Sequence, residues 1–193
     1  MRSANLFNFN LFEMRKIRTI FKRGSNNKVI DELDVDFEFI SAMPTEKLDG
    51  MNIRATVRSG ELVRLEKRRN PTSVQKESGI IDPWYTDADA NDSADQYLFD
   101  AVSNRFPDML IPDGEWSGEA IGPKIQGNPL RLTKRTIVFF SLGEAPEFPG
   151  APNTYNELKE WLPKQQSKFG NGPIEGIIWH RGEDMVKIKT KDF

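Results

Sequence analysis

Hydrophobic residues recur at every second position along much of the chain, which is the spacing of a strand with one buried face. The clearest run has Ile53, Ala55 and Val57 alternating with polar residues. Two shorter runs near the N-terminus, 17–21 and 35–39, alternate in the same way. The other segments that this spacing predicts as strands are 61–67, 114–121, 136–142, 173–180 and 184–190.

Two segments carry helix start signals. Ser93 followed by Gln96, and Thr154 followed by Glu157, have the spacing of a capping box ahead of an apolar stripe. We interpret the Asp- and Ser-rich stretch 82–95 as a solvated loop that caps the first of these helices. Many strands and few helices predict an α+β fold with mostly antiparallel sheets, flanked by a few helices.

Composition narrows the function classes. The chain has 193 residues, which favours one globular domain. It contains no cysteine and a single histidine, His180, so disulfides, Cys-ligated zinc and a Ser-His-Asp triad are disfavoured. No apolar run approaches the roughly 20 residues that span a bilayer. We therefore expect an intracellular, cytoplasmic protein with no membrane partner.

Lys47 stands between two strand-like runs, in the stretch EKLDGMN. A lysine near a strand end is ordinarily a solvent-facing charge. As a nucleophile it needs burial or nearby cations to lower the pKa of its amine. Lys187 and Lys189 share one face of the last predicted strand and are candidates for those cations. The alternative for that strand is an ordinary amphipathic edge.

Acidic side chains lie on two other predicted strands. Glu115 and Glu119 share one face of 114–121, and Glu175 is embedded in an apolar segment. A buried carboxylate is costly unless it is paired or binds something. Pairing with a lysine and binding of a phosphate-associated divalent metal both stay open.

The net charge of -2 argues against a chain that is basic throughout, but it allows a local basic groove. The densest basic run lies in 64–69, and a second one follows in 124–135. Either run is a solvated face or part of a nucleic-acid groove. The cations of these two runs are Arg64, Lys67, Arg68, Arg69, Lys124, Arg131, Lys134 and Arg135.

Taken in order, these segments resemble the covalent nucleotidyltransferases, which include ATP-dependent DNA and RNA ligases and mRNA capping enzymes. Five motifs of that superfamily have counterparts here, namely KLDG (47–50), GEAIG (118–122), FF (139–140), EGII (175–178) and KIK (187–189). The stretch TEKLDGMN is similar to the T-E-K-x-x-G-x-N form of small RNA ligases. The run EAIGPKIQGNP (119–129) is similar to that of an RNA ligase family that joins 5′-phosphate and 3′-hydroxyl ends.

The resemblance implies a nucleotidyltransferase (ATP-grasp-like) domain without an OB domain. Residues 1–193 would form this single minimal domain, with 1–40 as strands or a cap packed on it. It implies an ATP- and Mg²⁺- (or Mn²⁺-) dependent RNA ligase of RNA repair that acts through a lysyl-AMP intermediate on RNA with 5′-phosphate and 3′-hydroxyl ends. A DNA ligase, another covalent nucleotidyltransferase and a non-catalytic nucleic-acid-binding relative stay open. So does an end-healing kinase/phosphatase partner, and we expect a monomer.

The resemblance also implies residue roles. Lys47 would be the nucleophile, and Lys187 and Lys189 would hold the α-phosphate. Glu119, preferred over Glu115, and Glu175 would serve the metal. The residues implied to bind the nucleotide are Glu46, Asn52, Arg69, Glu119, Phe140 (with Phe139 as the alternative), Glu175, Lys187 and Lys189. The residues implied to bind nucleic acid are Arg68, Arg69 and Lys124.

Overall fold

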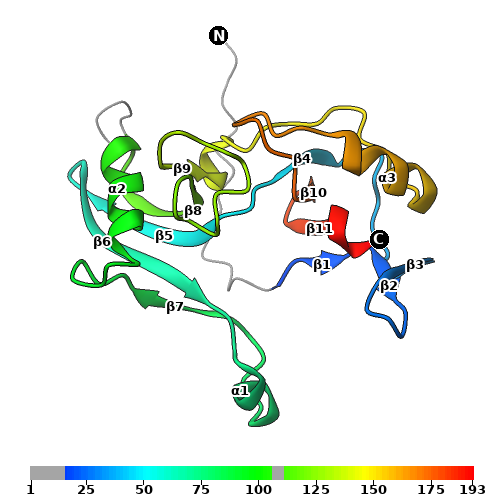
Figure 1. The fold of residues 1–193 in the computed structure, drawn as a ribbon, viewed down its shortest axis with the longest axis horizontal. Helices are drawn as coiled ribbons and strands as arrows, with labels where there is room; N and C mark the ends of the chain where they lie inside the picture. Colours follow the sequence, from blue (N-terminus) through cyan, green and yellow to red (C-terminus); the bar gives the residue numbers. More distant parts are fainter. Residues whose placement is uncertain (1–15, 106–110) are drawn as a thin grey trace.

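The computed structural model describes residues 16–105 and 111–193. They form an α+β fold of mostly antiparallel sheets with few helices (Figure 1). The predicted fold class is confirmed at this level. Of the predicted N-terminal cap, 1–15 lie outside the described residues. Within the described part, no helix is long and apolar enough to cross a membrane.

A five-stranded sheet forms one half of the molecule, in the order β7-β6-β5-β8-β9. Its strands are β5 (Met51–Arg58), β6 (Glu61–Arg69), β7 (Trp84–Asp87), β8 (Gly114–Ile121) and β9 (Thr136–Phe139). Helix α2 (Gln96–Arg105) packs its Leu98, Ala101 and Val102 on one face of the sheet. Because side chains alternate along a strand, the polar residues of β5 and β8 lie on the opposite face.

A four-stranded sheet forms the other half, in the order β1-β11-β10-β4. Its strands are β1 (Arg18–Thr19), β4 (Met43–Lys47), β10 (Gly176–Arg181) and β11 (Asp184–Lys189). Its apolar face, with Ile177 and Ile188, belongs to the same buried cluster as Leu158 of α3 (Tyr155–Trp161). The hairpin of β2 (Phe21–Arg23) and β3 (Val29–Leu33) adds Phe21 and Val29 to that cluster.

The two sheets lie side by side and are connected at the end of β4 (Figure 1). Only residues 48–50 separate Lys47, the last residue of β4, from Met51, the first of β5. A Cβ on Gly50 would lie 2.2 Å from the backbone oxygen of Ala120, so only glycine fits here. Leu48 belongs to a small buried cluster with Ile121 of β8, which ties this connection to the five-stranded sheet.

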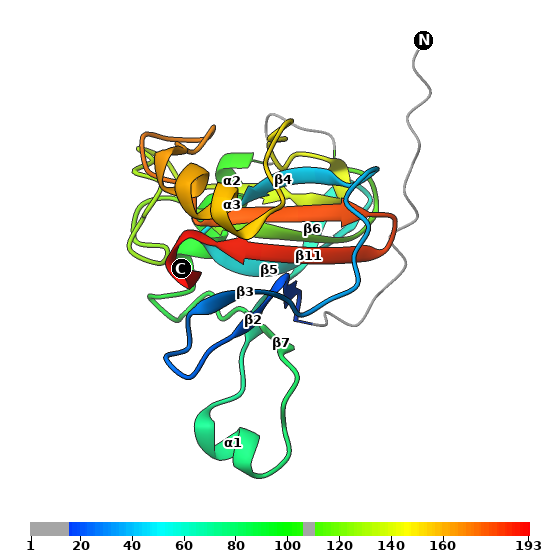
Figure 2. The same cartoon turned by 90° about the vertical axis from the view of Figure 1, so that its right-hand side faces the viewer.

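Between β6 and β7 the chain projects away from both sheets and carries the short helix α1 (Ser73–Glu77) at its tip (Figure 2). Thr72 and Gln75 form a capping box there. The remaining helical turns are η2 (Phe140–Leu142), η3 (Leu162–Lys164) and η4 (Thr190–Asp192).

Several sequence expectations are wrong in detail. Residues 35–39 alternate but form no strand, and Val35, Phe37 and Phe39 pack against the core as irregular chain. The run 17–21 is split into β1 and β2, with Ile20 fully buried between them. The stretch 82–95 is not all loop, because it contains β7, which pairs with β6. The strand predicted over 136–142 ends at Phe139 and continues as η2.

The predicted capping boxes also differ from the observed helix starts. Helix α2 begins at Gln96, two residues later than an N-cap at Ser93 would give. Thr154 takes the N-cap position of α3 as predicted, but its hydroxyl donates to the Glu157 carboxylate at 2.5 Å and makes no capping bond to a backbone N–H. The Asp-rich turn before α2 instead makes local Asp side chain to backbone hydrogen bonds, as from Ala94 N–H to Asp92.

Candidate active site between the two sheets

The register of the four-stranded sheet places the three candidate lysines on one face. Lys47 of β4 and Lys189 of β11 both lie opposite Gly176, the first residue of the strand between them. Lys187 is one row further along, opposite Ile178. Since Gly176 has no side chain, the strand between Lys47 and Lys189 contributes none to their row.

Glu175, which precedes Gly176, bridges the two lysines. Its Oε2 lies 2.5 Å from Nζ of Lys47, and its Oε1 lies 2.5 Å from Nζ of Lys189. The carboxylate is 9% exposed. Burial opposes its ionisation, but the charges of the two lysines and their hydrogen bonds outweigh burial and lower the pKa of Glu175. Glu175 is therefore paired with lysines, which is one of the two roles that the sequence left open for it.

Lys187 is the third ammonium of the group and is half-buried. Burial lowers its pKa to about 8, helped by the positive charges of Lys189, Lys47 and Lys16. Two lysines thus pair with one carboxylate, and the charge of the third, Lys187, acts on the same group. Lys187 has no carboxylate partner in the described chain, so it is available to an anionic ligand.

Glu119 faces the same group from β8 of the other sheet. Gly50 N–H donates to its Oε1 at 3.1 Å, and Asn52 Nδ2 lies 3.5 Å from its Oε2. Burial raises the pKa of Glu119 to about 7, although the nearby charge of Lys47 opposes this. Asp49 also lies close by, and burial and the charge of Glu175 raise its pKa. Carboxyls from both sheets therefore surround Lys47.

A row of polar side chains extends from Glu119 across the five-stranded sheet. Asn52 lies opposite Glu119, and the Tyr85 hydroxyl donates to Asn52 Oδ1 at 2.8 Å. Arg68 pairs with Tyr85 on the adjacent strands. Its Nε is buried and has no hydrogen-bond partner in the described structure, so it is placed to bind a further group.

A second row of side chains packs against the first. Arg54 donates to Glu66 through two nitrogens, at 2.6 and 2.8 Å. The Arg54 guanidinium lies 4.6 Å from the centre of the Tyr85 ring. Glu66 is 2% exposed, so this bidentate pair is largely shielded from solvent and orients Tyr85 beneath the site.

Glu46 directly precedes Lys47 in β4, and Phe140 packs on the cluster of Leu48, which directly follows Lys47. Glu46 is 1% exposed and accepts from Lys168 N–H at 3.1 Å, while its Oε1 finds no partner in the described chain. Burial raises its pKa. Phe140 is half-buried and packs on the cluster of Leu48, whereas Phe139 is fully enclosed in the core. Of the two aromatic candidates, only Phe140 is accessible.

Other sequence candidates lie elsewhere. Arg69 follows Arg68 in β6, so it faces the opposite side of the sheet and is exposed. Lys124 is on the loop after β8, with Nζ 5.9 Å from the Tyr97 ring centre. Lys67 is buried in an ion pair with Asp95, which removes it from any basic groove. Glu115 lies further along β8, 3.8 Å from Arg54.

Sequence reasoning missed Tyr85 and Arg54. Tyr85 sits in the stretch interpreted as loop, although the run Trp84-Tyr85-Thr86 has strong strand propensity that would have indicated β7. Arg54 lies on the polar face that alternation predicts for its strand, but its bidentate pairing depends on the register with β6 and has no local signal.

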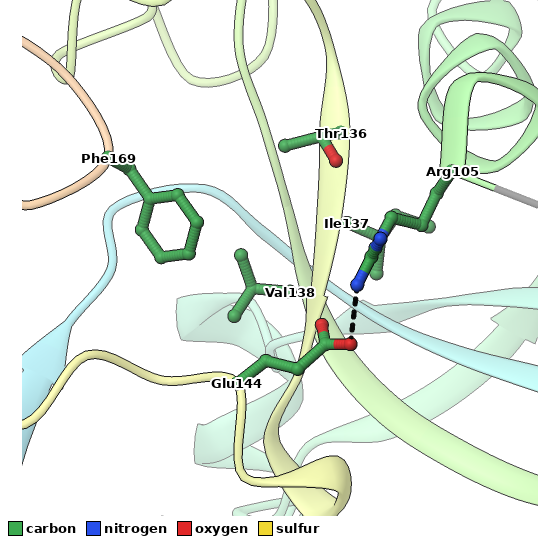
Figure 3. A pocket seen from close by; sticks show the side chains of 6 residues that line it. All are labelled: Arg105, Thr136, Ile137, Val138, Glu144 and Phe169. Carbon is green, nitrogen blue, oxygen red and sulfur yellow. Dashed lines mark hydrogen bonds and ion pairs between the residues drawn. The ribbon is translucent and has the colours of Figure 1, made fainter. Parts of the chain in front are cut away.

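A hollow of ≈ 360 Å³ opens elsewhere, between α2 and β9 (Figure 3). An Arg105–Glu144 ion pair of 2.7 Å spans it. Its other lining residues are Thr136, Ile137, Val138 and Phe169. No residue implied by the motifs lines this hollow, so the convergence of charged groups around Lys47 is the better candidate site.

Titration of Glu119 gives a prediction for stability. Its folded pKa of about 7 exceeds its ordinary value of 4.5, so the folded state holds the proton more tightly. The free energy of unfolding should therefore fall as pH rises from about 4.5 to about 7, by up to about 3 kcal/mol. Urea unfolding should show that Glu119→Gln removes this fall. Glu115→Gln, at an exposed position of the same strand, should leave the dependence of stability on pH unchanged. If wild type and both variants show parallel dependences, the assignment to Glu119 is contradicted.

The dependence of stability on pH that we expect from Lys187 has the opposite sign. Its folded pKa of about 8 is below the ordinary 10.5, so its charge disfavours folding at neutral pH and this cost fades as pH rises toward about 10.5. Lys187→Met should raise the free energy of unfolding at neutral pH by about 1–2 kcal/mol, after discounting for solvent screening. Lys189→Met, which breaks an ion pair with Glu175, should lower it. Chemical denaturation of both variants tests the contrast.

Comparison with known proteins finds likeness in structure alone. No protein-family model matches the chain, and no curated protein does. The RNA ligase of Naegleria gruberi solved with PPi is 16% identical, over 99% of this chain and 61% of that chain, with a TM-score of 0.50. A point mutant of that ligase with ATP and Mn is 14% identical, over 78% of this chain and 50% of that one, with a TM-score of 0.48.

The chain spans between half and about three fifths of the length of these two structures. At this identity the likeness to the PPi-bound ligase establishes a shared fold and assigns no residue role. It agrees with the α+β class that the strand pattern predicts.

Proposed function

We propose that this chain is an ATP-dependent RNA ligase in which Lys47 carries AMP as a covalent intermediate. The observation that carries the proposal is the clustering of Lys47, Lys187 and Lys189 on one face of a sheet. Glu175 pairs with Lys47 and Lys189, and Glu119 faces them from the second sheet. The motif order in the sequence and the fold shared with an RNA ligase support it.

In the first step the Lys47 ammonium gives a proton to solvent, and the lone pair that this leaves on Nζ attacks the α-phosphorus of ATP. A nitrogen–phosphorus bond forms, the bond from the α-phosphorus to the bridging oxygen breaks, pyrophosphate leaves, and the nitrogen releases a second proton to solvent. Because Lys47 is paired with Glu175, this pair must separate before attack. The incoming phosphates compete with Glu175 for Lys189 and contact Lys187, and these two ammonium groups neutralise the charge that develops on the phosphates.

The nucleoside would occupy the polar row and the aromatic edge next to Lys47. Glu119 and Asn52 present acceptors and a donor to ribose hydroxyls, and Arg68 supplies an unpartnered Nε. Phe140 offers its partly exposed ring to the adenine, and Glu46 has a free buried oxygen. Arg68 takes the nucleotide role that the motif comparison gave to Arg69, since Arg69 faces away.

In the later steps an oxygen of the RNA 5′-phosphate attacks the phosphorus of lysyl-AMP and breaks its bond to Nζ. A 3′-hydroxyl then attacks the 5′-phosphorus, AMP leaves, and a phosphodiester bond remains. Arg68 is proposed to contact the RNA as well, whereas Arg69 faces away from this side of the sheet. Phosphoryl transfer of this kind depends on positioning and charge neutralisation, so the single histidine is no obstacle.

A divalent ion fits the site only together with phosphates. No group of three or more acidic or histidine side chains in the described residues is arranged to hold a metal. Mg²⁺ commonly binds one or two carboxylates plus substrate phosphates, and Glu119 and Glu175 can provide these. When bound, Mg²⁺ or Mn²⁺ would neutralise phosphate charge.

The proposal is tested by intact-protein mass spectrometry after incubation with ATP and Mg²⁺ or Mn²⁺. One adenylate adduct should appear, and peptide mapping should place it on Lys47. A parallel incubation with GTP in place of ATP tests for a capping-type enzyme. Sealing of nicked DNA compared with sealing of nicked RNA distinguishes a DNA ligase from an RNA ligase. Absence of any adduct across pH and both metals rejects the proposal and leaves a binding protein.

A further inference from the structure

The loop that follows β8 has an unusual backbone. Between residues 122 and 131, four non-glycine residues adopt left-handed φ values: Lys124 (66°), Gln126 (46°), Asn128 (54°) and Arg131 (55°). Side chains at such φ values are disfavoured, particularly for long residues such as lysine, glutamine and arginine. Backbone of this kind persists only where the surroundings hold it, and it gathers at functional sites.

Three linked turns form this loop. The N–H of Ile125 bonds Gly122 O at 3.0 Å, that of Asn128 bonds Ile125 O at 2.8 Å, and that of Arg131 bonds Asn128 O at 3.0 Å. Each turn begins where the previous one ends. The exposed residues Lys124 and Gln126 are therefore fixed at the corners of a continuous hydrogen-bonded chain.

Side chains anchor the loop from below. Ile125 is buried in the core of the five-stranded sheet, and Leu130 is buried in the cluster with Leu48, beside Lys47. The Asn128 amide bonds both the N–H and the C=O of Leu132, at 3.0 and 2.9 Å. The loop is thus anchored at several points and lies next to the candidate site.

A second loop closes against the first without a gap. A Cβ on Gly170 would lie 2.0 Å from Leu130 O, and one on Gly172 would lie 2.1 Å from Pro129 O. These two glycines belong to the segment that leads into Glu175 and β10. The loop after β8 is therefore held by both sheets.

The outer surface of this segment is positive. Residues 122–135 include four cations and no acidic residue. Arg135 pairs with Asp100 at 3.0 Å. Lys124, Arg131 and Lys134 are exposed, and no carboxylate of the described chain pairs with them. None of the strongly exposed large hydrophobic residues lies in this segment, so its surface offers charge and hydrogen-bond donors.

We propose that the surface formed by Lys124, Arg131 and Lys134 docks the phosphodiester backbone of an RNA strand as it enters the Lys47 site. The proposal rests on the ligase function proposed above and names the surface that its polymer substrate uses. Three exposed cations that pair with no carboxylate of the described chain suit a chain of phosphates. A loop whose backbone is already held by its turns and buried anchors fits that partner, because less of its backbone has to be ordered on binding.

The test compares two triple variants with the same loss of charge. Lys124→Gln/Arg131→Gln/Lys134→Gln removes the proposed surface. Lys22→Gln/Lys159→Gln/Lys164→Gln removes three exposed cations from the hairpin and the α3 region. Binding of a short, fluorescent, 5′-phosphorylated single-stranded RNA is measured by anisotropy at several salt concentrations, and lysyl-AMP formation is measured for each protein.

The loop variant should bind RNA at least about tenfold more weakly at low salt, and its slope of log affinity against log salt should be shallower by about 2. Its lysyl-AMP formation should equal that of wild type, which shows an intact fold. The control triple should bind like wild type. Equal RNA affinity of the loop variant, or an equal loss in both triples, overturns the proposal. Absence of lysyl-AMP in wild type would count against the ligase function and leave the RNA-binding comparison valid.

Discussion

Replacing Lys47 by arginine is expected to abolish covalent uptake of AMP, by at least about 1000-fold, or roughly 4 kcal/mol in activation free energy. Arginine keeps the positive charge and can still contact Glu175, but its guanidinium does not lose a proton and cannot attack phosphorus. Lys47→Ala should have the same effect, because it removes the nucleophile. Intact mass after incubation with ATP measures the adduct directly.

Sealing of RNA that already carries AMP on its 5′-phosphate provides the control for Lys47. This step does not need the amine, so both variants should still join pre-adenylylated RNA. Glu175 retains Lys189 as a partner in Lys47→Ala, and the fold should survive. An adduct that persists in Lys47→Arg would place the nucleophile elsewhere and remove the mechanism.

Glu175→Ala is expected to cost about 3 kcal/mol in the free energy of unfolding and to abolish AMP uptake. The carboxylate neutralises Lys47 and Lys189, and Lys187 lies beside them, so its loss leaves three ammonium groups facing one another. Removing one partner of a buried ion pair typically costs about 3–5 kcal/mol. Urea unfolding at neutral pH measures the change. Glu183→Ala, in the exposed turn between β10 and β11, should be nearly neutral.

Pyrophosphate distinguishes the anion site from simple packing around Glu175. If the three lysines form a phosphate site, added pyrophosphate should recover part of the stability that Glu175→Ala loses, because it places anionic oxygens among the same ammonium groups. Sodium chloride at the same ionic strength should recover less. A Glu175→Ala protein as stable as wild type, or one that pyrophosphate does not stabilise more than salt does, would be evidence against this arrangement.

The strand pattern predicted β5 and β8 well because their alternation is regular and both belong to a sheet with one covered face. It failed at 35–39 because alternation reports which side chains are buried, while a strand also needs a neighbouring backbone to bond. It failed at β7 because acidic and small polar residues around the Trp84–Asp87 strand gave the stretch the composition of a loop.

The site was predictable as a set of residues and less so as an arrangement. Motif order indicated Lys47, Glu175, Lys187 and Lys189, and the structure brings them together. Which of Arg68 and Arg69 faces the site was not readable, because the β5–β6 register shifts between Thr56 and Val57. Such a bulge adds one residue to a strand, so alternation along β6 no longer predicts which face of the sheet a side chain occupies. The sharing of Glu175 by two lysines likewise depends on a register across three strands.

The short connection 48–50 ties the position of the Lys47 amine to that of the five-stranded sheet. Gly50 donates to Glu119 and leaves no room for a side chain, and Leu48 is buried with Ile121. The nucleophile and the nucleotide contacts on β5 and β8 therefore share one anchored segment. The same geometry means that a residue inserted in 48–50 would misalign all of those contacts at once.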